Sequence, residues 1–152
     1  MHLQIKGSPS DTASNIRAIV VALAGAGVNI LGIGPDFTPP HVRVAVEHAD
    51  PYNPDDAGDP FNIALNAMEA AGIAPTIRPA VTVKLPNKPG ALKAVLNRLM
   101  REGYEAESIL VLAGGNEDAT EVQFGVAPTL FAGWDQESER VIEVVQGDLD
   151  RI

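Results

Sequence analysis

Cysteine is absent from this chain of 152 residues. That absence excludes disulfides, thiolate zinc sites and cysteine nucleophiles, and it favours a reducing compartment, so we expect the protein in the cytoplasm. Long apolar runs are also absent, since none reaches the roughly 18 residues of a membrane span. The segment Met1–Gly7 lacks the basic patch and apolar core of a signal peptide. We therefore expect neither export nor a membrane partner.

Positive charge is scarce, with 11 Lys and Arg residues against 20 Asp and Glu residues and a formal net charge of -9. Affinity for nucleic acid comes largely from clustered Lys and Arg, so neither nucleic acid nor an anionic membrane surface is an expected partner. The hydrophobic share of 45% and the charged share of 20% are typical of a packed globular protein.

The first half of the chain predicts the order strand, helix, strand, strand, helix, strand. Leu3 and Ile5 alternate with polar neighbours as in a half-buried strand, and Asp11, Thr12 or Ser14 is the expected cap of the helix that follows. The apolar face of that helix has helical spacing and consists of Ile16, Ile19, Val20 and Leu23. The later elements are strands at 28–34 and 42–46, a loop at 49–60, a helix from 61 to 72, and a strand or linker at 74–80.

The second half repeats this order at a spacing of 76 residues. Leu92, Val95, Leu96 and Leu99 fall on the apolar positions of the first helix, and Gly103 falls on Gly27. The chain therefore divides into a first unit at 1–78 and a second at 79–152. We predict an α+β protein of two ferredoxin-like βαββαβ units, each with a four-stranded antiparallel sheet covered on one face by helices. A helical pattern runs from 138 to the end. The sequence therefore does not decide whether the second unit has a final strand.

The second unit resembles the ACT domain, a small regulatory module of amino-acid metabolism. The resemblance rests on the strand, turn and helix start Val81-Thr82-Val83-Lys84-Leu85-Pro86-Asn87-Lys88-Pro89-Gly90-Ala91-Leu92, and on Arg101-Glu102-Gly103-Tyr104. In the first unit the turn positions read Asp11-Thr12-Ala13-Ser14, without Pro or Gly, although Gly27-Val28-Asn29-Ile30 resembles the family's start of strand two.

The resemblance implies that an amino-acid ligand binds between units. Its contacts come from the turn before helix one of one unit and from the start of strand two of its neighbour. The expected ligand-binding residues are Asn87, Lys88, Pro89, Gly90, Ala91, Leu92, Val28, Asn29 and Ile30. Glycine at position 90 admits a close approach, and the free N–H groups that open the helix suit a carboxylate. Glu105 stands at the position equivalent to Asn29, so one ligand per chain is expected.

Simpler interpretations apply to several motifs. The turn at 86–90 also works as a plain strand-to-helix connection. Gly25 and Gly27 end a helix instead of opening one, which argues against a dinucleotide fingerprint. His41 and His48 are seven residues apart, on opposite faces of a strand, and the acidic residues of the 49–60 loop lack the spacing of a calcium loop. No metal and no cofactor is therefore expected.

No nucleophile with a base within reach, and no paired carboxylates, can be located in the sequence, so no catalytic residue is assigned and a small hydrolase is the least favoured class. The favoured function is a non-catalytic sensor for an amino acid or a similar small molecule. The alternative is a module of the same fold that dimerises or binds a protein without any ligand. A homodimer is expected, and the identity of a regulated enzyme partner is left open.

Overall fold

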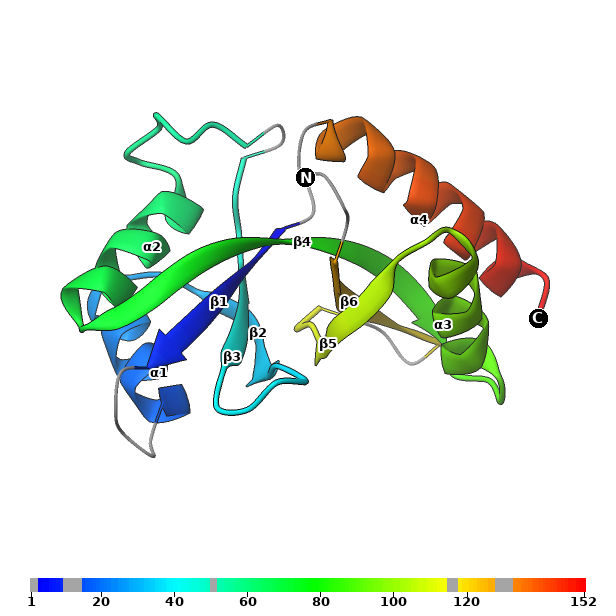
Figure 1. Cartoon of the computed structure of the whole chain (residues 1–152), viewed down its shortest axis with the longest axis horizontal. Helices are drawn as coiled ribbons and strands as arrows, with labels where there is room; N and C mark the ends of the chain where they lie inside the picture. Colours follow the sequence, from blue (N-terminus) through cyan, green and yellow to red (C-terminus); the bar gives the residue numbers. More distant parts are fainter. Residues whose placement is uncertain (1–2, 10–14, 50–51, 115–117, 128–132) are drawn as a thin grey trace.

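The computed structural model describes residues 3–9, 15–49, 52–114, 118–127 and 133–152. Within them lie six strands and four helices (Figure 1). In chain order they are β1 (Leu3–Pro9), α1 (Asn15–Gly25), β2 (Ile30–Pro35), β3 (Val42–Val46), α2 (Pro60–Ala70), β4 (Ile73–Pro86), α3 (Ala91–Arg101), β5 (Glu105–Val111), β6 (Ala119–Ala127) and α4 (Trp134–Asp150). The expected caps at positions 11, 12 and 14 lie outside the described residues.

One antiparallel sheet connects the two halves, with the strand order β2-β3-β1-β4-β6-β5. Strand β4 belongs to both halves, because residues 73–79 pair with β1 and residues 80–86 pair with β6. The sequence divides this segment into a strand or linker at 74–80 and a new strand from 81, whereas the structure has a single strand of 14 residues. The predicted division after residue 78 therefore falls inside β4.

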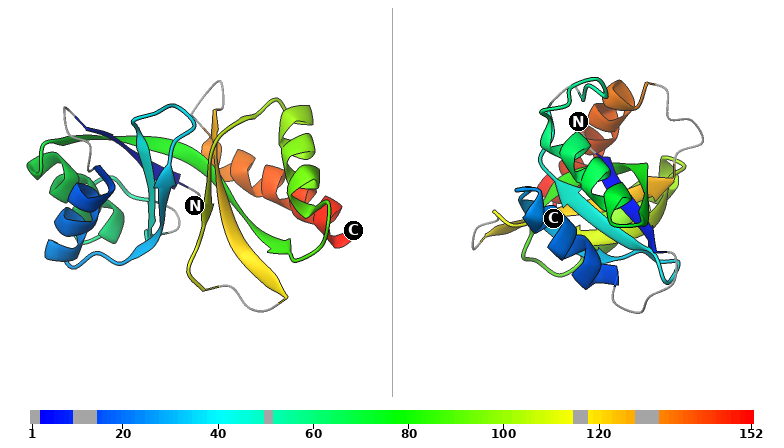
Figure 2. Two further views of the ribbon diagram at one scale, coloured as in Figure 1. Left: turned by 90° about the horizontal axis from the view of Figure 1, so that it is seen from below. Right: turned by 90° about the vertical axis from the view of Figure 1, so that its left-hand side faces the viewer.

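Each half covers one face of its strands with helices, and the other faces of the two halves turn toward each other. Figures 1 and 2 show α1 and α2 at one end of the long axis, α3 and α4 at the other, and the strands between them. The curled sheet brings β2 close to β5, where the Ala113 N–H donates to the Leu31 carbonyl at 2.8 Å. A small buried apolar cluster of Ala45, Leu110 and Leu112 also joins the halves. Both faces of the strands are thus covered.

Details of the backbone repeat at the spacing found in the sequence. Helices α1 and α3 both have 11 residues and begin 76 positions apart. Gly27 and Gly103 follow them with φ of 73° and 87°, in the left-handed region that favours glycine. The register of β2 on β3 shifts between Ile30 and Gly32, and that of β5 on β6 shifts between Ala106 and Ser108. A bulge at equivalent positions supports two copies of one ancestral unit.

The α+β class with ferredoxin-like, ACT-like units is confirmed, with one correction. The first half has the expected four strands, whereas the described residues of the second half form three, and α4 occupies the chain up to Asp150, where the sequence did not decide whether a fourth strand follows. The edge of β4 that such a strand would cover is partly capped by Gln146. Its side-chain amide accepts from the Lys84 N–H and donates to the Lys84 carbonyl, both at 3.2 Å. One side chain thus replaces two backbone hydrogen bonds of the missing strand.

Candidate functional site: the turn that opens helix α3

The predicted turn, residues Asn87–Leu92, is called the α3 turn here. It connects the end of β4 to the first residues of α3, and the Asn87 N–H donates to the Asp118 carbonyl at 3.3 Å. Gly90 is the residue that precedes the helix and has φ of 87°, which requires glycine in practice. No heavy atom lies within 4 Å of the position that a Cβ on Gly90 would take. A ligand can therefore approach the turn on the side where a Gly90 side chain would point.

The N-terminus of α3 lacks a cap, whereas that of α2 has one. Asp59 precedes α2, is buried, and accepts from the N–H groups of Phe61 and Ala49 at 2.9 and 2.8 Å. Gly90 has no side chain for this role. Among the described residues, the N–H groups of Leu92 and Lys93 have no hydrogen-bond acceptor. Unsatisfied N–H groups at a helix start, with the positive end of the helix dipole, attract a carboxylate or phosphate.

A groove lies beside the α3 turn, between the exposed face of α3 and the end of α4. Its volume is about 380 Å³. The residues that line it are Gly90, Lys93, Ala94, Asn97, Arg101, Asp148, Arg151 and Ile152. Only Gly90 of these was a predicted site residue. The sequence did carry a signal for Lys93, Asn97 and Arg101, because positions i, i+4 and i+8 share one face of a helix.

The second predicted segment, Val28–Ile30, lies at the far end of the molecule from the α3 turn. It connects α1 to β2, at one end of the long axis, whereas the α3 turn lies at the other (Figures 1 and 2). Asn29 is exposed and Val28 is buried. Within one chain, therefore, the predicted segment 87–92 and the predicted segment 28–30 lie apart from each other.

The seam between the two halves of one chain is filled by polar side chains. Arg43 is fully buried there and donates to Asp36 at 2.6 Å and to Gln4 at 3.3 Å. Across the seam, Ser108 donates to the same oxygen of Gln4 at 2.8 Å, and Glu107 lies 3.3 Å from Arg43. At this part of the seam, buried side chains of both halves are in contact with one another.

Gly125 shows how tightly the seam is packed. A Cβ at this position would overlap the Ser108 hydroxyl and would lie 2.7 Å from atoms of Arg43 and Gln4. Burial opposes the ionisation of Asp36, but hydrogen bonds from the Thr38 N–H and from Arg43 outweigh it and hold its pKa below the usual value. Asp36 therefore holds the buried Arg43 within the first half, while Ser108 and Glu107 of the second half contact Gln4 and Arg43 across the seam.

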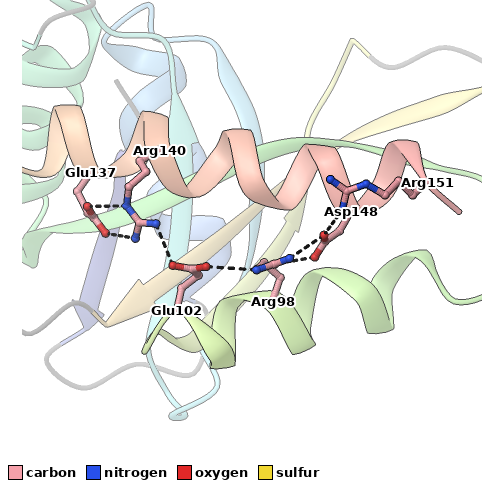
Figure 3. A network of polar contacts seen from close by, with 6 residues as sticks. All are labelled: Arg98, Glu102, Glu137, Arg140, Asp148 and Arg151. Carbon is pink, nitrogen blue, oxygen red and sulfur yellow. Dashed lines mark hydrogen bonds and ion pairs between the residues drawn. The ribbon is translucent and has the colours of Figure 1, made fainter.

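Six charged residues form what we call the charge ladder, along the contact between α3 and α4 (Figure 3). They are Glu137, Arg140, Glu102, Arg98, Asp148 and Arg151. Arg98 donates to both carboxylate oxygens of Asp148, at 2.6 and 2.9 Å. Arg140 joins Glu137, at 2.7 Å, to Glu102, at 2.9 Å. The ladder holds α4 against α3 and so shapes the groove beside the α3 turn.

The ladder shifts the protonation equilibria of two groups near its far end. Hydrogen bonds from Arg140 and from the Tyr104 hydroxyl lower the pKa of Glu137 to about 2. Burial and the 2.6 Å hydrogen bond to Glu137 raise the pKa of Tyr104 to about 12. Both groups keep one protonation state at neutral pH, so they serve structure and not proton transfer.

The described residues contain no group of three or more His, Cys, Asp or Glu side chains placed to hold a metal ion. In the same part of the chain, no helix combines the length and apolar character that a membrane span requires.

The chain matches no family model, and the search of curated proteins found no match. Solved structures match it over nearly its whole length. A Bacteroides thetaiotaomicron protein has 21% identity and a TM-score of 0.60, over 94% of this chain and 87% of that one. The regulatory subunit of aspartate kinase from Thermus thermophilus, in its ligand-free form, has 18% identity and a TM-score of 0.58, over 97% and 91%. Clostridium acetobutylicum aspartate kinase has 12% identity and a TM-score of 0.56, with 97% of this chain on 33% of that enzyme.

These likenesses define the class by its fold, which is a tandem of two ACT-like units. The match extends over most of the Thermus thermophilus regulatory subunit but over only a third of the Clostridium acetobutylicum enzyme.

Proposed function

We propose that this chain is a non-catalytic regulatory sensor that binds an amino acid or a similar small ligand at the α3 turn. The observation that carries the proposal is the uncapped start of α3 behind Gly90, with open space above it and two N–H groups without an acceptor. A ligand carboxylate satisfies these N–H groups as the Asp59 carboxylate does at the start of α2. The likeness to an aspartate kinase regulatory subunit supports a regulatory role.

The proposed site is completed by Val28, Asn29 and Ile30 of a second copy of the chain. These residues and the α3 turn lie at opposite ends of one copy, so a site that uses both needs two copies. Asn29 is exposed, and its amide both donates and accepts, which suits a ligand's ammonium and carboxylate groups. A two-fold dimer would then hold two equivalent sites. The remaining predicted contacts, Asn87, Lys88 and Pro89, are exposed around the turn.

The first test is thermal unfolding against a panel of the twenty amino acids. A ligand at a hundredfold excess over its Kd stabilises the folded state by about 2.7 kcal/mol. We expect one amino acid or a few related ones to do so, and Gly90→Val to abolish the effect. Gly72→Val is the matched control, because Gly72 also has a positive φ, of 78°, and open space around it, but lies before β4. A flat response of the wild type across the panel contradicts the proposal.

The second test asks whether two copies build the site. In a two-fold dimer, Gly90→Val and Asn29→Ala each damage both sites, so either variant alone should bind weakly. A mixed dimer of the two variants contains one site with an intact turn and an intact Asn29. We expect purified mixed dimers to bind ligand at half of the wild-type stoichiometry. Binding that is lost in both variants and not restored in verified mixed dimers contradicts a shared site.

A ligand-free dimerisation module is the second candidate, and one observation favours it. The outer face of α1 exposes apolar side chains, with Val21 57% and Ile16 47% exposed. Exposed apolar residues on one helix face often mark a contact with another chain. A dimer that forms without ligand and is unaffected by Gly90→Val, together with the flat ligand response above, would favour this candidate.

A further inference from the structure

We propose a second binding site, formed within a single copy of the chain, for a small oxyanion that carries two or more negative charges. The site is the groove between α3 and the end of α4, and we call it the cationic groove after Lys93, Arg101 and Arg151, which line it. This inference goes beyond the amino-acid sensor proposed above, although Gly90 borders both sites. It does not need a second copy.

The charges of the groove are not balanced by its own acidic residues. Asp148 is the acidic side chain in the lining, and Arg98 already binds both of its carboxylate oxygens. Arg151 shares that carboxylate at 3.3 Å and is 77% exposed. Lys93 and Arg101 form no ion pair with any residue that the structure describes. The groove therefore brings three cations close to Asp148, which Arg98 already binds, and to the chain end at Ile152, whose backbone oxygen accepts from Lys88 at 3.3 Å.

This concentration of positive charge is unusual for a chain with a net charge of -9 and only 11 Lys and Arg residues. Electrostatic repulsion from the rest of an acidic protein disfavours the binding of anions at random sites. The positive end of the α3 helix dipole, at Gly90 and Lys93, also borders the groove. The Asn97 side chain, which lines the same surface, supplies a neutral donor.

The equivalent face of α1 shows that these charges are not a general feature of the repeated helix. Positions 93, 97 and 101 of α3 correspond, at the spacing of 76 residues, to Arg17, Val21 and Gly25 of α1. One cation is present there, and two of the three polar positions are apolar or glycine. The second unit therefore differs from the first on a surface that packing of the core does not constrain.

The geometry indicates the class of ligand. Lys93 and Arg101 are eight residues apart on one helix face, which separates their Cα atoms by about 12 Å. A volume of about 380 Å³ is at the small end of the range for metabolite pockets. Cations at both ends of such a groove suit a compact ligand with several anionic oxygens, either a phosphoryl compound or a polycarboxylate. A lone carboxylate would leave two of the three cations unused.

The test titrates the full chain with inorganic pyrophosphate and, separately, with citrate, and sodium chloride at matched ionic strength serves as the blank. Isothermal titration calorimetry measures binding up to about 10 mM of each anion, ten times a Kd of 1 mM. We expect saturable binding of one anion per chain. Binding of pyrophosphate alone identifies a phosphoryl ligand, and binding of citrate alone identifies a polycarboxylate. Saturation by neither anion above the chloride blank overturns the proposal.

Single substitutions then test where the anion binds. Lys93→Gln and Arg101→Gln should each weaken binding roughly fivefold or more, because a charge-assisted contact is lost. Arg17→Gln removes the same charge from the equivalent position of α1 and should change the affinity by less than about twofold. If all three variants weaken anion binding equally, the effect comes from the net charge of the protein, and the proposed site is wrong. Circular dichroism melting confirms that these exposed substitutions leave the fold intact.

The result is separable from the amino-acid sensor. Arg101→Gln should lose the anion and retain the stabilisation by amino acids, and the mixed-dimer test does not involve the groove. Anion affinity should also be independent of protein concentration, because one copy forms the groove. An affinity that rises with dimer formation would overturn a single-copy site.

Discussion

Helices α1 and α3 hold equivalent positions in the two units but make different contacts on their outer faces. Both bury a leucine at the same position, with Leu23 0% and Leu99 1% exposed. On α3, Arg98 joins the charge ladder to α4, whereas the equivalent residue of α1 is Ala22. The comparison indicates that the two units share a core position but differ in the charge of their outer surfaces. The α3 turn and the cationic groove both belong to that charged second unit.

The largest expected effect tests the shared core. Leu23→Ala and Leu99→Ala should each lower the free energy of unfolding by about 2–5 kcal/mol, because each leaves a cavity under a helix. The two losses should agree within about 1 kcal/mol if the packing is truly equivalent. Urea denaturation of both variants measures this. A loss at one position several times that at the other would break the comparison.

A smaller effect is expected where α2 begins. Asp59→Ala removes the hydrogen bonds to the N–H groups of Phe61 and Ala49, and it should cost about 1–2 kcal/mol of stability. Asp59→Asn keeps one acceptor oxygen for the Phe61 N–H but loses the acceptor for the Ala49 N–H, so it should cost less than Asp59→Ala without being neutral. Urea denaturation again measures both. No difference between the two variants would mean that the cap is not what distinguishes the start of α2 from that of α3.

A still smaller effect on stability is expected at the central pair of the charge ladder, Arg98 and Asp148. Arg98→Met keeps most of the aliphatic stem but loses both hydrogen bonds to Asp148, a half-buried pair of near-ideal geometry. A double-mutant cycle with Asp148→Asn should show this coupling, and 1 M salt, a concentration at which the screening length is about 3 Å, should reduce it. Arg17→Met on α1 provides the control without a ladder, and a similar loss there would contradict the distinction between the two helices.

The smallest effect is a dependence on acid at the end of the ladder. The pKa of Glu137 is lowered to about 2 in the folded state, so its contribution to stability is present above its unfolded pKa and is lost as the pH falls toward 2. Glu137→Gln should remove this part of the acid sensitivity. Thermal melts between pH 5 and pH 2 compare the variant with the wild type, using about 4.3 as the unfolded reference. If the melting temperatures of the variant and the wild type fall in parallel as the pH is lowered, Glu137 does not contribute to the acid sensitivity.

Local patterns were sufficient to predict the repeated unit. The apolar spacing of α3 and the stop at Gly103 fixed that helix to within a residue or two, because both features act within a few residues of the backbone. The continuity of β4 was not predictable, since a strand that changes partner at residues 79 and 80 has no local signature. Arg43 alternates with valines as an exposed residue would, and its burial depends on residues of the second half such as Glu107 and Gly125, far along the chain.

The candidate site was predictable only in part, for the same reason. The α3 turn was found because Pro89 and Gly90 specify a local geometry, and the structure gives Gly90 the positive φ that the turn needs. The groove beside it was missed because the helix was interpreted from its apolar face alone. The distance from Asn29 to the turn depends on how the two units pack, and the buried seam around Arg43 determines that packing. No local pattern in the sequence encodes it.

The most direct test of the sensor follows backbone amide resonances while the stabilising amino acid is added. The account predicts that the Leu92 and Lys93 amides shift and saturate together with the Asn29 side-chain amide, at one ligand per chain. Saturable shifts confined to other parts of the molecule, with the start of α3 unchanged, would contradict it.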